Sequence, residues 1–164
     1  MTSDPDPPIS LETADPIETE RYLHEHIPIS AAIGVRVARA DLESVELYAA
    51  LGPNTNHRST AFGGSSISLA ILAAWTLVHL HTQNLVGSHQ VVIRHSAMEY
   101  LAPISDEFHA RCDSPGAEAW RRFGQSLHRR GKAQITLTVP VTSGGAQTGS
   151  FAGTYAAIRL PAQA

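Results

Sequence analysis

The strongest pattern in the chain is a stretch from Ser65 to about His81 that is apolar on nearly every side. Its large apolar residues recur without leaving a polar face: Ile67, Leu69, Ile71, Leu72, Trp75, Leu77, Val78 and Leu80. A surface helix has one polar face, so this pattern predicts a helix over about residues 64–82 that other elements surround. A curved sheet is the element we expect to wrap it.

Alternating apolar and polar residues predict strands before and after this helix. The expected strands cover residues 35–37, 45–51, 90–100, 107–113, 135–141 and 149–160. An extra N-terminal helix is expected to begin at Asp15-Pro16 and end before Pro28, followed by a short turn over residues 30–33. A small amphipathic helix is expected at Ala117–Arg130. This order predicts an α+β fold, with a mostly antiparallel sheet around one central helix.

The length and composition indicate one globular domain. The 164 residues suffice for a single core, which we expect to span residues 16–162. Residues 1–15 are acidic and rich in proline, so we expect a disordered tail.

Cys112 is the only cysteine, which excludes an intrachain disulfide. The start lacks the features of a signal peptide, and the apolar run Ile67–Leu80 is short for a bilayer, so we expect a cytoplasmic protein without membrane contact.

The charge is unevenly distributed along the chain. Twelve Lys and Arg residues stand against fifteen Asp and Glu, for a net charge of -3, which argues against a protein that binds nucleic acid. Six of the acids lie in residues 1–20, and residues 47–98 contain no Asp or Glu at all. The second fact excludes any mechanism that needs a carboxylate from that region.

The segment that leads into the buried helix carries the candidate chemistry. It reads Asn54-Thr-Asn-His-Arg-Ser-Thr-Ala-Phe-Gly-Gly-Ser-Ser66. Two glycines let the backbone approach a ligand closely, and the amides of Gly64, Ser65 and Ser66 are expected at a helix start, where the dipole favours negative charge. Such amides suit the oxygen of a thioester carbonyl as it gains charge. Tight packing of the helix on the sheet is an equally open explanation of the glycine pair.

Four segments give the chain a resemblance to a known family. They are Tyr22–Ser30, Asn56–Ser65, Ala70–Trp75 and Tyr100–Pro103. The chain resembles the hot-dog fold acyl-thioester enzymes, and most of all the thioesterase family typified by the YiiD C-terminal domain. The resemblance implies a homodimer or dimer of dimers with active sites at the subunit interface. It also implies a substrate carried on coenzyme A or on the phosphopantetheine of acyl carrier protein, in fatty acid metabolism, with no cofactor of the enzyme's own.

The resemblance also suggests roles for individual residues. The expected catalytic residues are Asn56, His57, Gly64 and Ser65. The expected substrate contacts are Phe62, Gly63, Ser66, Trp75 and Glu99. Many relatives use an Asp or Glu on or near the central helix, which this chain lacks, and Phe62 stands where related branches often have His. A water molecule must still be activated for hydrolysis, and the remaining candidates are His57, Glu99 or a group of the partner chain. His57 and Glu99 each also have a purely structural interpretation, as a loop residue and an exposed strand residue.

The missing carboxylate keeps two alternatives to hydrolysis open. Decarboxylation of a malonyl thioester needs no general base; it needs a stabilised enolate oxygen and a poorly hydrated place for the departing carboxylate. Asn56 and the helix amides are candidates to hold the enolate, and Phe62 to exclude water. The second alternative is a module that binds acyl thioesters without catalysis.

A basic cluster lies between Arg111 and Lys132, where six bases stand against two acids. We expect Arg121 and Arg122 to attract the phosphates of coenzyme A or the acidic face of a carrier protein, although a solvated helix face has the same composition. Four of the remaining histidines come in pairs two residues apart, His24 with His26 and His79 with His81, and the two members of a pair point to different sides of a helix. We therefore expect no metal site.

Overall fold

The computed structural model describes residues 15–161. The predicted tail of residues 1–15 lies almost wholly outside the described residues. The elements in chain order are α1 (Pro16–His26), α2 (Pro28–Ala32), β1 (Arg36–Ala40), β2 (Ser44–Ala49), the short 3-10 turn η2 (Gly52–Asn54), α3 (Gly63–Gln83), β3 (His89–Tyr100), β4 (Phe108–Asp113), α4 (Ala117–Arg130), β5 (Lys132–Ser143) and β6 (Ala146–Arg159).

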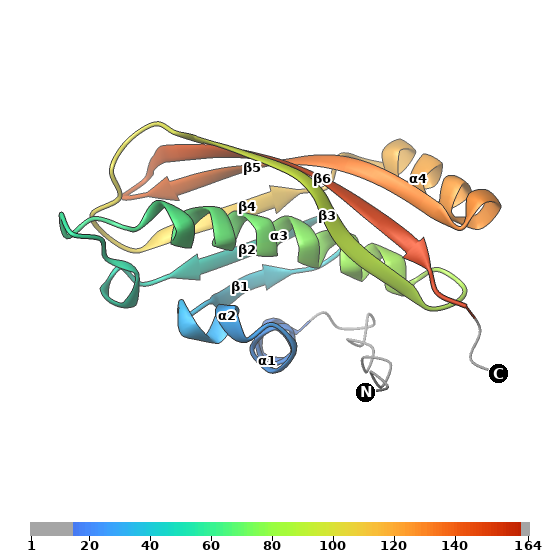
Figure 1. Ribbon diagram of the computed structural model, residues 1–164, viewed down its shortest axis with the longest axis horizontal. Coiled ribbons are helices and arrows are strands. Elements are labelled where there is room, and N and C mark those ends of the chain that lie inside the picture. The colour runs from blue at the N-terminus through green and yellow to red at the C-terminus, as the bar shows by residue number, and fades with distance from the viewer. Residues whose placement is uncertain (1–14, 162–164) are drawn as a thin grey trace.

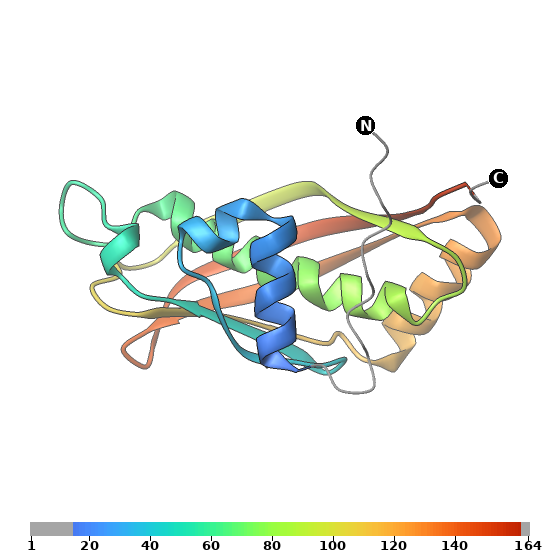
Figure 2. The same cartoon turned by 90° about the horizontal axis from the view of Figure 1, so that it is seen from below.

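The six strands form one antiparallel sheet in the order β1-β2-β4-β5-β6-β3. The sheet is strongly curved, and α3 lies along its concave side in contact with five of the strands (Figure 1). This confirms the predicted α+β fold. The helix α4 packs against β5 at one end of the molecule, whereas α1 packs against β1 nearer its middle (Figures 1 and 2).

The burial of α3 explains its uniformly apolar sequence. Twelve of its 21 residues are buried, and the other nine are half-buried rather than exposed. The sheet covers one side, and Tyr155 on β6 donates from its hydroxyl to the carbonyl of Ile71 at 2.8 Å. On the open side, the ring of Tyr22 in α1 stacks on His79 with 5.2 Å between centroids, so α1 covers part of that side (Figure 2).

The apolar helix is longer than the run Ile67–Leu80 indicated, so the prediction that it is too short for a bilayer was wrong. The helix has 21 residues and is long and apolar enough to cross a bilayer, the one such helix in residues 15–161. Inside the fold, 61% of its most apolar window is buried. Its hydrophobic surface is therefore accounted for by contacts with the sheet and α1.

The N-terminal segment contains two helices where one helix and a turn were predicted. Asp15 caps α1 as expected, with its carboxylate accepting from the amide of Ile17 at 3.0 Å. Residues 28–32 form the helix α2 because Pro28 stands at its first position, where the fixed φ of proline favours a helix start. The expected turn therefore begins later, and Gly34 completes it with a positive φ of 71°.

The C-terminal end of α3 is covered by α4. The ring of His81 stacks on Trp120 with 3.7 Å between centroids, and Trp120 meets Phe123 edge to face. At the opposite end, the N-terminus of α3 follows the loop after β2 (Figure 1). The C-terminal end of α3 is therefore covered by a helix, whereas its N-terminal end is reached by a loop. The predicted glycine motif lies at the N-terminal end.

Candidate functional site

The N-terminus of α3 is the place where the predicted glycine motif meets the fold. Phe62 is the N-cap residue, and its carbonyl accepts from the amides of Ser65 at 3.0 Å and Ser66 at 3.4 Å. The helix thus begins one residue earlier than predicted. The amides that precede the first helical hydrogen bond are those of Gly63 and Gly64, rather than Gly64, Ser65 and Ser66.

No side chain caps this helix start within the described part of the chain. Phe62 has no side-chain oxygen, and α3 carries no acidic residue in its first turn. The positive end of the helix dipole is therefore not offset by a carboxylate of the helix itself. Backbone amides at an uncapped helix N-terminus attract an oxygen that carries negative charge.

Two aromatic rings cover the glycine pair. The hydroxyl of Tyr100, the last residue of β3, donates to the carbonyl of Gly63 at 3.1 Å, and its ring lies 3.2 Å from where a Cβ on Gly63 would be. The ring of Phe62 comes within 2.3 Å of where a Cβ on Gly64 would be. Both rings remain more than half exposed, at 57% for Tyr100 and 59% for Phe62. The glycines thus permit a close approach of aromatic rings as well as of a ligand.

Asn56 organises the loop before the helix. Its Oδ1 accepts from the amides of Arg58 at 2.8 Å and Thr60 at 3.3 Å, while its Nδ2 donates to Thr60 Oγ1 at 2.9 Å and to the carbonyl of Ala61 at 3.3 Å. Both ends of the amide are therefore engaged within residues 56–61. Asn56 therefore stabilises the loop. Because both ends of its side-chain amide already form hydrogen bonds, some of these bonds would have to break before Asn56 could bind an enolate oxygen.

Asn54 is a second loop residue, one that sequence reasoning did not select. Its Nδ2 donates to the carbonyls of Ile33 at 2.9 Å and Ala50 at 2.8 Å, and its own carbonyl accepts from the amide of Phe62 at 2.7 Å. Its side chain is 2% exposed. Asn54 therefore anchors the N-cap of α3 to the body of the protein. The only sequence signal was its place at the start of the glycine motif.

The other polar candidates near the helix start differ in their surroundings. His57 lies exposed in the loop between η2 and α3. The hydroxyl of Ser66 donates to the carbonyl of Gly63 at 3.0 Å, and that of Ser68 to the carbonyl of Gly64 at 2.7 Å. Ser65 is 7% exposed, directly after the two glycines. The structure thus brings Gly63, Gly64 and Ser65 together at the helix start, whereas the hydroxyl of Ser66 is engaged in a hydrogen bond to the helix backbone.

Glu99 faces away from the helix. It pairs with Ser150 on β6, and the residues on either side of it in β3 pair with Phe151 and Gly149, which are both buried beside α3. Tyr100 therefore lies on the concave face and Glu99 on the convex face. A carboxylate on the convex face cannot reach a group bound at Gly63 of the same chain.

Two further carboxylates lie at the end of the molecule that holds the start of α3. Asp106 and Glu107 follow Ile104, whose carbonyl accepts from the amide of Ala61 at 2.8 Å. Glu107 is engaged by His109, with 3.1 Å between Oε1 and Nε2. Sequence reasoning missed these acids because they are separated from the glycine motif by more than forty residues.

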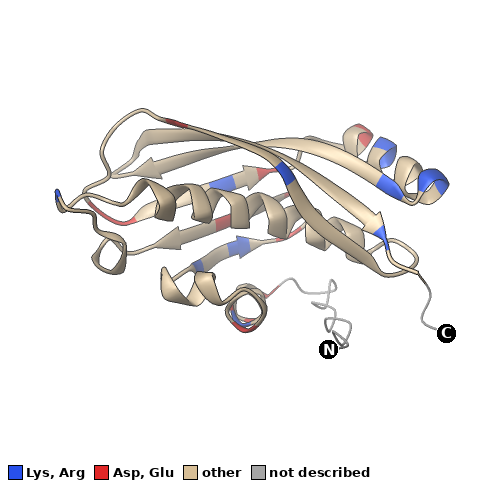
Figure 3. Cartoon of the chain, in the orientation of Figure 1, with Lys and Arg blue, Asp and Glu red and all other residues tan. Residues whose placement is uncertain are grey.

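Trp75 and the basic residues of α4 lie far from the glycine pair. Trp75 is twelve residues along α3, so about 18 Å from its start, and donates from Nε1 to the carbonyl of Val91 at 3.1 Å. Arg121 and Arg122 are on α4, at the C-terminal end of α3, where Lys and Arg gather (Figure 3). Arg121 is paired with Glu118. These residues do not belong to the same cluster as Asn56 and Gly64 within one chain.

A metal site was not expected from the sequence. Within residues 15–161, no three His, Cys, Asp or Glu side chains are grouped in a way that could hold a metal ion. The side chains of His24 and His81 instead contact backbone carbonyls, those of Val35 and Leu42. The buried Cys112 lies in the core, where burial and the nearby Asp113 raise the pKa of its thiol to about 12.

A curved antiparallel sheet around one helix that starts with a glycine pair defines a hot-dog fold protein of the thioesterase type. The chain belongs to the family described as "Putative thioesterase (yiiD_Cterm)", whose model matches residues 17–159. This confirms the family and the fold that the sequence indicated.

Solved structures agree with this assignment. A protein of unknown function from Chlorobaculum tepidum TLS is 29% identical, with a TM-score of 0.83, over 88% of this chain and 97% of that one. A "putative thioesterase" from Shewanella oneidensis is 25% identical, with a TM-score of 0.75, over 89% of this chain and 97% of that one. A Pseudomonas aeruginosa protein named a probable thioesterase shares the fold, with 20% identity, a TM-score of 0.76, and 89% and 97% coverage.

Proposed function

We propose that this protein hydrolyses acyl thioesters at the N-terminus of α3. The observation that carries the proposal is the uncapped start of α3, where the amides of Gly63 and Gly64 precede the first helical hydrogen bond. Attack of water on a thioester carbonyl places a negative charge on its oxygen. Two fixed amides at the positive end of a helix dipole stabilise that charge without reorganising, which lowers the barrier to the reaction.

The neighbouring side chains fit the two parts of such a substrate. The exposed rings of Phe62 and Tyr100 offer apolar walls for the acyl group or the pantetheine arm. Ser65 is positioned beside the glycines to donate a hydrogen bond. Asn56 and Asn54 keep the loop and the N-cap in place. The substrate we propose is carried on coenzyme A or acyl carrier protein, and the enzyme uses no cofactor of its own.

The edge of the sheet supports a homodimer. Strand β3 is twelve residues long, forms one edge and is exposed along most of its length. A long exposed edge presents unpaired backbone groups that pair readily with another strand. Leu101, directly after β3 and beside Tyr100, is itself 52% exposed. A second copy paired along β3 would cover these apolar groups and could bring a base to the helix start, with the enzyme acting in the cytoplasm.

Decarboxylation of malonyl thioesters is the second candidate. It is favoured by one observation: α3 carries no carboxylate, and Glu99 lies on the opposite face of the sheet. In this reaction the bond between the carboxylate carbon and C2 breaks, carbon dioxide leaves, and the electron pair forms the thioester enolate. The amides of Gly63 and Gly64 would hold the enolate oxygen, and a proton from water then gives the acetyl thioester.

Product analysis distinguishes the reactions. The full chain is incubated with acetyl, malonyl and long-chain acyl thioesters of coenzyme A and of a carrier protein, and free thiol and carbon dioxide are measured. Hydrolysis releases one thiol and one free acid per turnover. Conversion of the malonyl to the acetyl thioester without free thiol supports decarboxylation instead. Tight binding of a thioester without any turnover would contradict both reactions and favour a binding module.

A further inference from the structure

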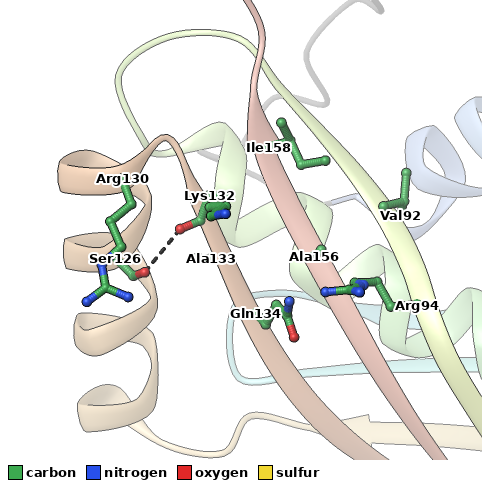
Figure 4. Close-up of a pocket in the computed structure, with 9 residues that line it drawn as sticks. All are labelled: Val92, Arg94, Ser126, Arg130, Lys132, Ala133, Gln134, Ala156 and Ile158. Carbon is green, nitrogen blue, oxygen red and sulfur yellow. Dashed lines mark hydrogen bonds between the residues drawn. The ribbon is translucent and has the colours of Figure 1, made fainter.

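A cleft of about 450 Å³ opens on the convex face of the sheet, on the other side from α3 (Figure 4). The strand register builds its floor. Ala156 of β6 lies between Gln134 of β5 and Val92 of β3, and Ile158 of β6 lies beside Lys132 of β5. The helix α4 forms one wall, held against the strand by a hydrogen bond from Ser126 Oγ to the carbonyl of Lys132 at 3.0 Å.

The cleft is lined by three cations and by no acidic residue. They are Arg94 on β3, Arg130 on α4 and Lys132 on β5. None of the three forms an ion pair with another residue of the described range 15–161. By contrast, Arg121 on the outer side of α4 is paired with Glu118. Three cations around one cleft, without an acidic partner, create a positive potential that attracts an anion.

The cations flank an apolar strip. Arg94 extends from β3 across β6 toward Gln134, while Arg130 and Lys132 stand on the side of α4 (Figure 4). Between them lie Ala156 and Ile158, and Ile158 is 43% exposed. A ligand that contacts both the apolar strip and the cations on its two sides has a flat apolar part and more than one phosphate. A guanidinium group binds phosphate with two parallel hydrogen bonds, so two arginines suit such a ligand.

This cleft is separate from the proposed thioester site of the same chain. It lies beside α4, which packs on the C-terminal end of α3 through His81 and Trp120. The glycine pair lies at the N-terminal end of the 21-residue helix α3 and on the opposite face of the sheet. A single thioester group bound at Gly63 therefore does not explain the cleft.

We propose that the cleft is a binding site for a phosphate-bearing nucleotide. Arg94, Arg130 and Lys132 hold the phosphates, the base lies on Ala156 and Ile158, and the amide of Gln134 contacts the edge of the base. Two sources share this chemistry: a free nucleotide that acts as an effector, or the nucleotide part of a coenzyme A thioester bound at the site of a neighbouring copy. The second source rests on the proposed function, and the binding site itself does not.

Direct binding tests the site independently of catalysis. Isothermal titration of the full chain at low salt uses adenosine, inorganic phosphate, ADP and adenosine 3',5'-bisphosphate as probes. We expect the two nucleotides to bind with one site per chain, and adenosine and phosphate to bind at least about tenfold more weakly. Arg130→Gln should weaken nucleotide binding about tenfold, because a charge-assisted hydrogen bond is lost. Arg129→Gln, the neighbouring arginine that does not line the cleft, is the matched control and should bind as the wild type does.

Kinetics then identify the source of the nucleotide. If the cleft holds the carrier, Arg130→Gln raises KM for an acyl-coenzyme A about tenfold and leaves KM for the matching acyl-pantetheine, which has no nucleotide, unchanged. If the nucleotide is an effector, the variant leaves both KM values unchanged, and ADP alters the rate of the wild type alone. The proposal is overturned if no nucleotide binds, if phosphate binds as tightly as ADP, or if Arg130→Gln and Arg94→Gln both bind nucleotides like Arg129→Gln.

Discussion

The hydroxyl of Tyr100 donates a hydrogen bond to the carbonyl of Gly63 at 3.1 Å, and so joins the end of the edge strand β3 to the first residue of α3. The same carbonyl accepts from the hydroxyl of Ser66 at 3.0 Å. Two donors on one carbonyl fix the orientation of the peptide that also carries the amide of Gly64. A strand that pairs with β3 would therefore lie next to the residue whose hydroxyl orients the helix start, which we propose as the thioester site.

Replacing Tyr100 with Phe removes this hydroxyl and keeps the ring. We expect kcat for thioester turnover to fall severalfold, because the peptide between Gly63 and Gly64 becomes less fixed. The free energy of unfolding should fall by about 1 kcal/mol, the usual net value of one hydrogen bond. Steady-state kinetics and thermal unfolding measure the two effects. Tyr48→Phe on β2, where the ring stacks on His109, is the control. An unchanged kcat in Tyr100→Phe would limit the hydrogen bond to a structural role.

Gly64→Ala should separate activity from stability. A Cβ at this position would lie 2.3 Å from the present place of the Phe62 ring, so the exposed ring must move. Alanine also favours the helix over glycine by up to about 1 kcal/mol. We therefore expect an unchanged or higher Tm together with a lower rate of turnover.

Gly124→Ala on α4 is the matched control for this variant. A Cβ there would lie 3.7 Å from Leu85, an ordinary contact, and the position is remote from the start of α3. The control should gain stability and keep full activity. Equal activity in Gly64→Ala and Gly124→Ala would contradict a catalytic role for the glycine pair.

The stability of the fold should fall on mild acidification. Burial lowers the pKa of His81 from its ordinary 6.5, partly opposed by the carbonyl of Leu42 that its ring contacts. Burial and Arg159 likewise lower the pKa of His89. The unfolded chain then binds protons at a higher pH than the folded chain, so the free energy of unfolding decreases as pH falls from 6.5 toward the lowered values.

Urea unfolding at several pH values between 8 and about 5 measures this loss. In His81→Phe the ring can still stack on Trp120, but it no longer titrates. We expect a smaller loss of stability on acidification in this variant, whatever its stability at pH 8. A pH dependence parallel to that of the wild type would contradict the assignment to His81.

The buried helix was predictable from sequence because its apolar pattern is independent of its neighbours. The expected range of about 64–82 compares with Gly63–Gln83 in the structure. The one-residue difference at the start matters for the chemistry, since it moves the uncapped amides to Gly63 and Gly64. A cap is set by local φ and ψ angles, and the sequence Phe-Gly-Gly-Ser allows more than one start.

The face of Glu99 was not predictable, because a β-bulge reverses the alternation of β3. Val91 and Ile93 pair with Ala157 and Tyr155 on the concave face, and the register then shifts between Ile93 and His95. Strict alternation of side chains along β3 would have placed Glu99 on the concave face of the sheet and Tyr100 on the convex face. The extra residue in the bulge exchanges them, so that an aromatic hydroxyl rather than a carboxylate meets the helix start.

The position of the basic cluster depends on tertiary packing as well. The sequence shows which of its residues are basic, but their distance from the glycine motif follows from the packing of α4 on the far end of α3. Within one chain the cluster divides between the outer side of α4, where Arg121 is paired, and the cleft beside Arg130. Docking of a substrate carrier by Arg121 and Arg122 stays a prediction.

The central claim is that a thioester carbonyl binds at the start of α3. A crystal structure of the protein with an acyl-coenzyme A analogue, in which a methylene group replaces the thioester sulfur, tests it most directly. We expect the carbonyl oxygen of the analogue at about 3 Å from the amide nitrogen of Gly63 or Gly64, beside the rings of Phe62 and Tyr100. A carbonyl bound elsewhere, with these two amides making no contact to the analogue, would contradict it.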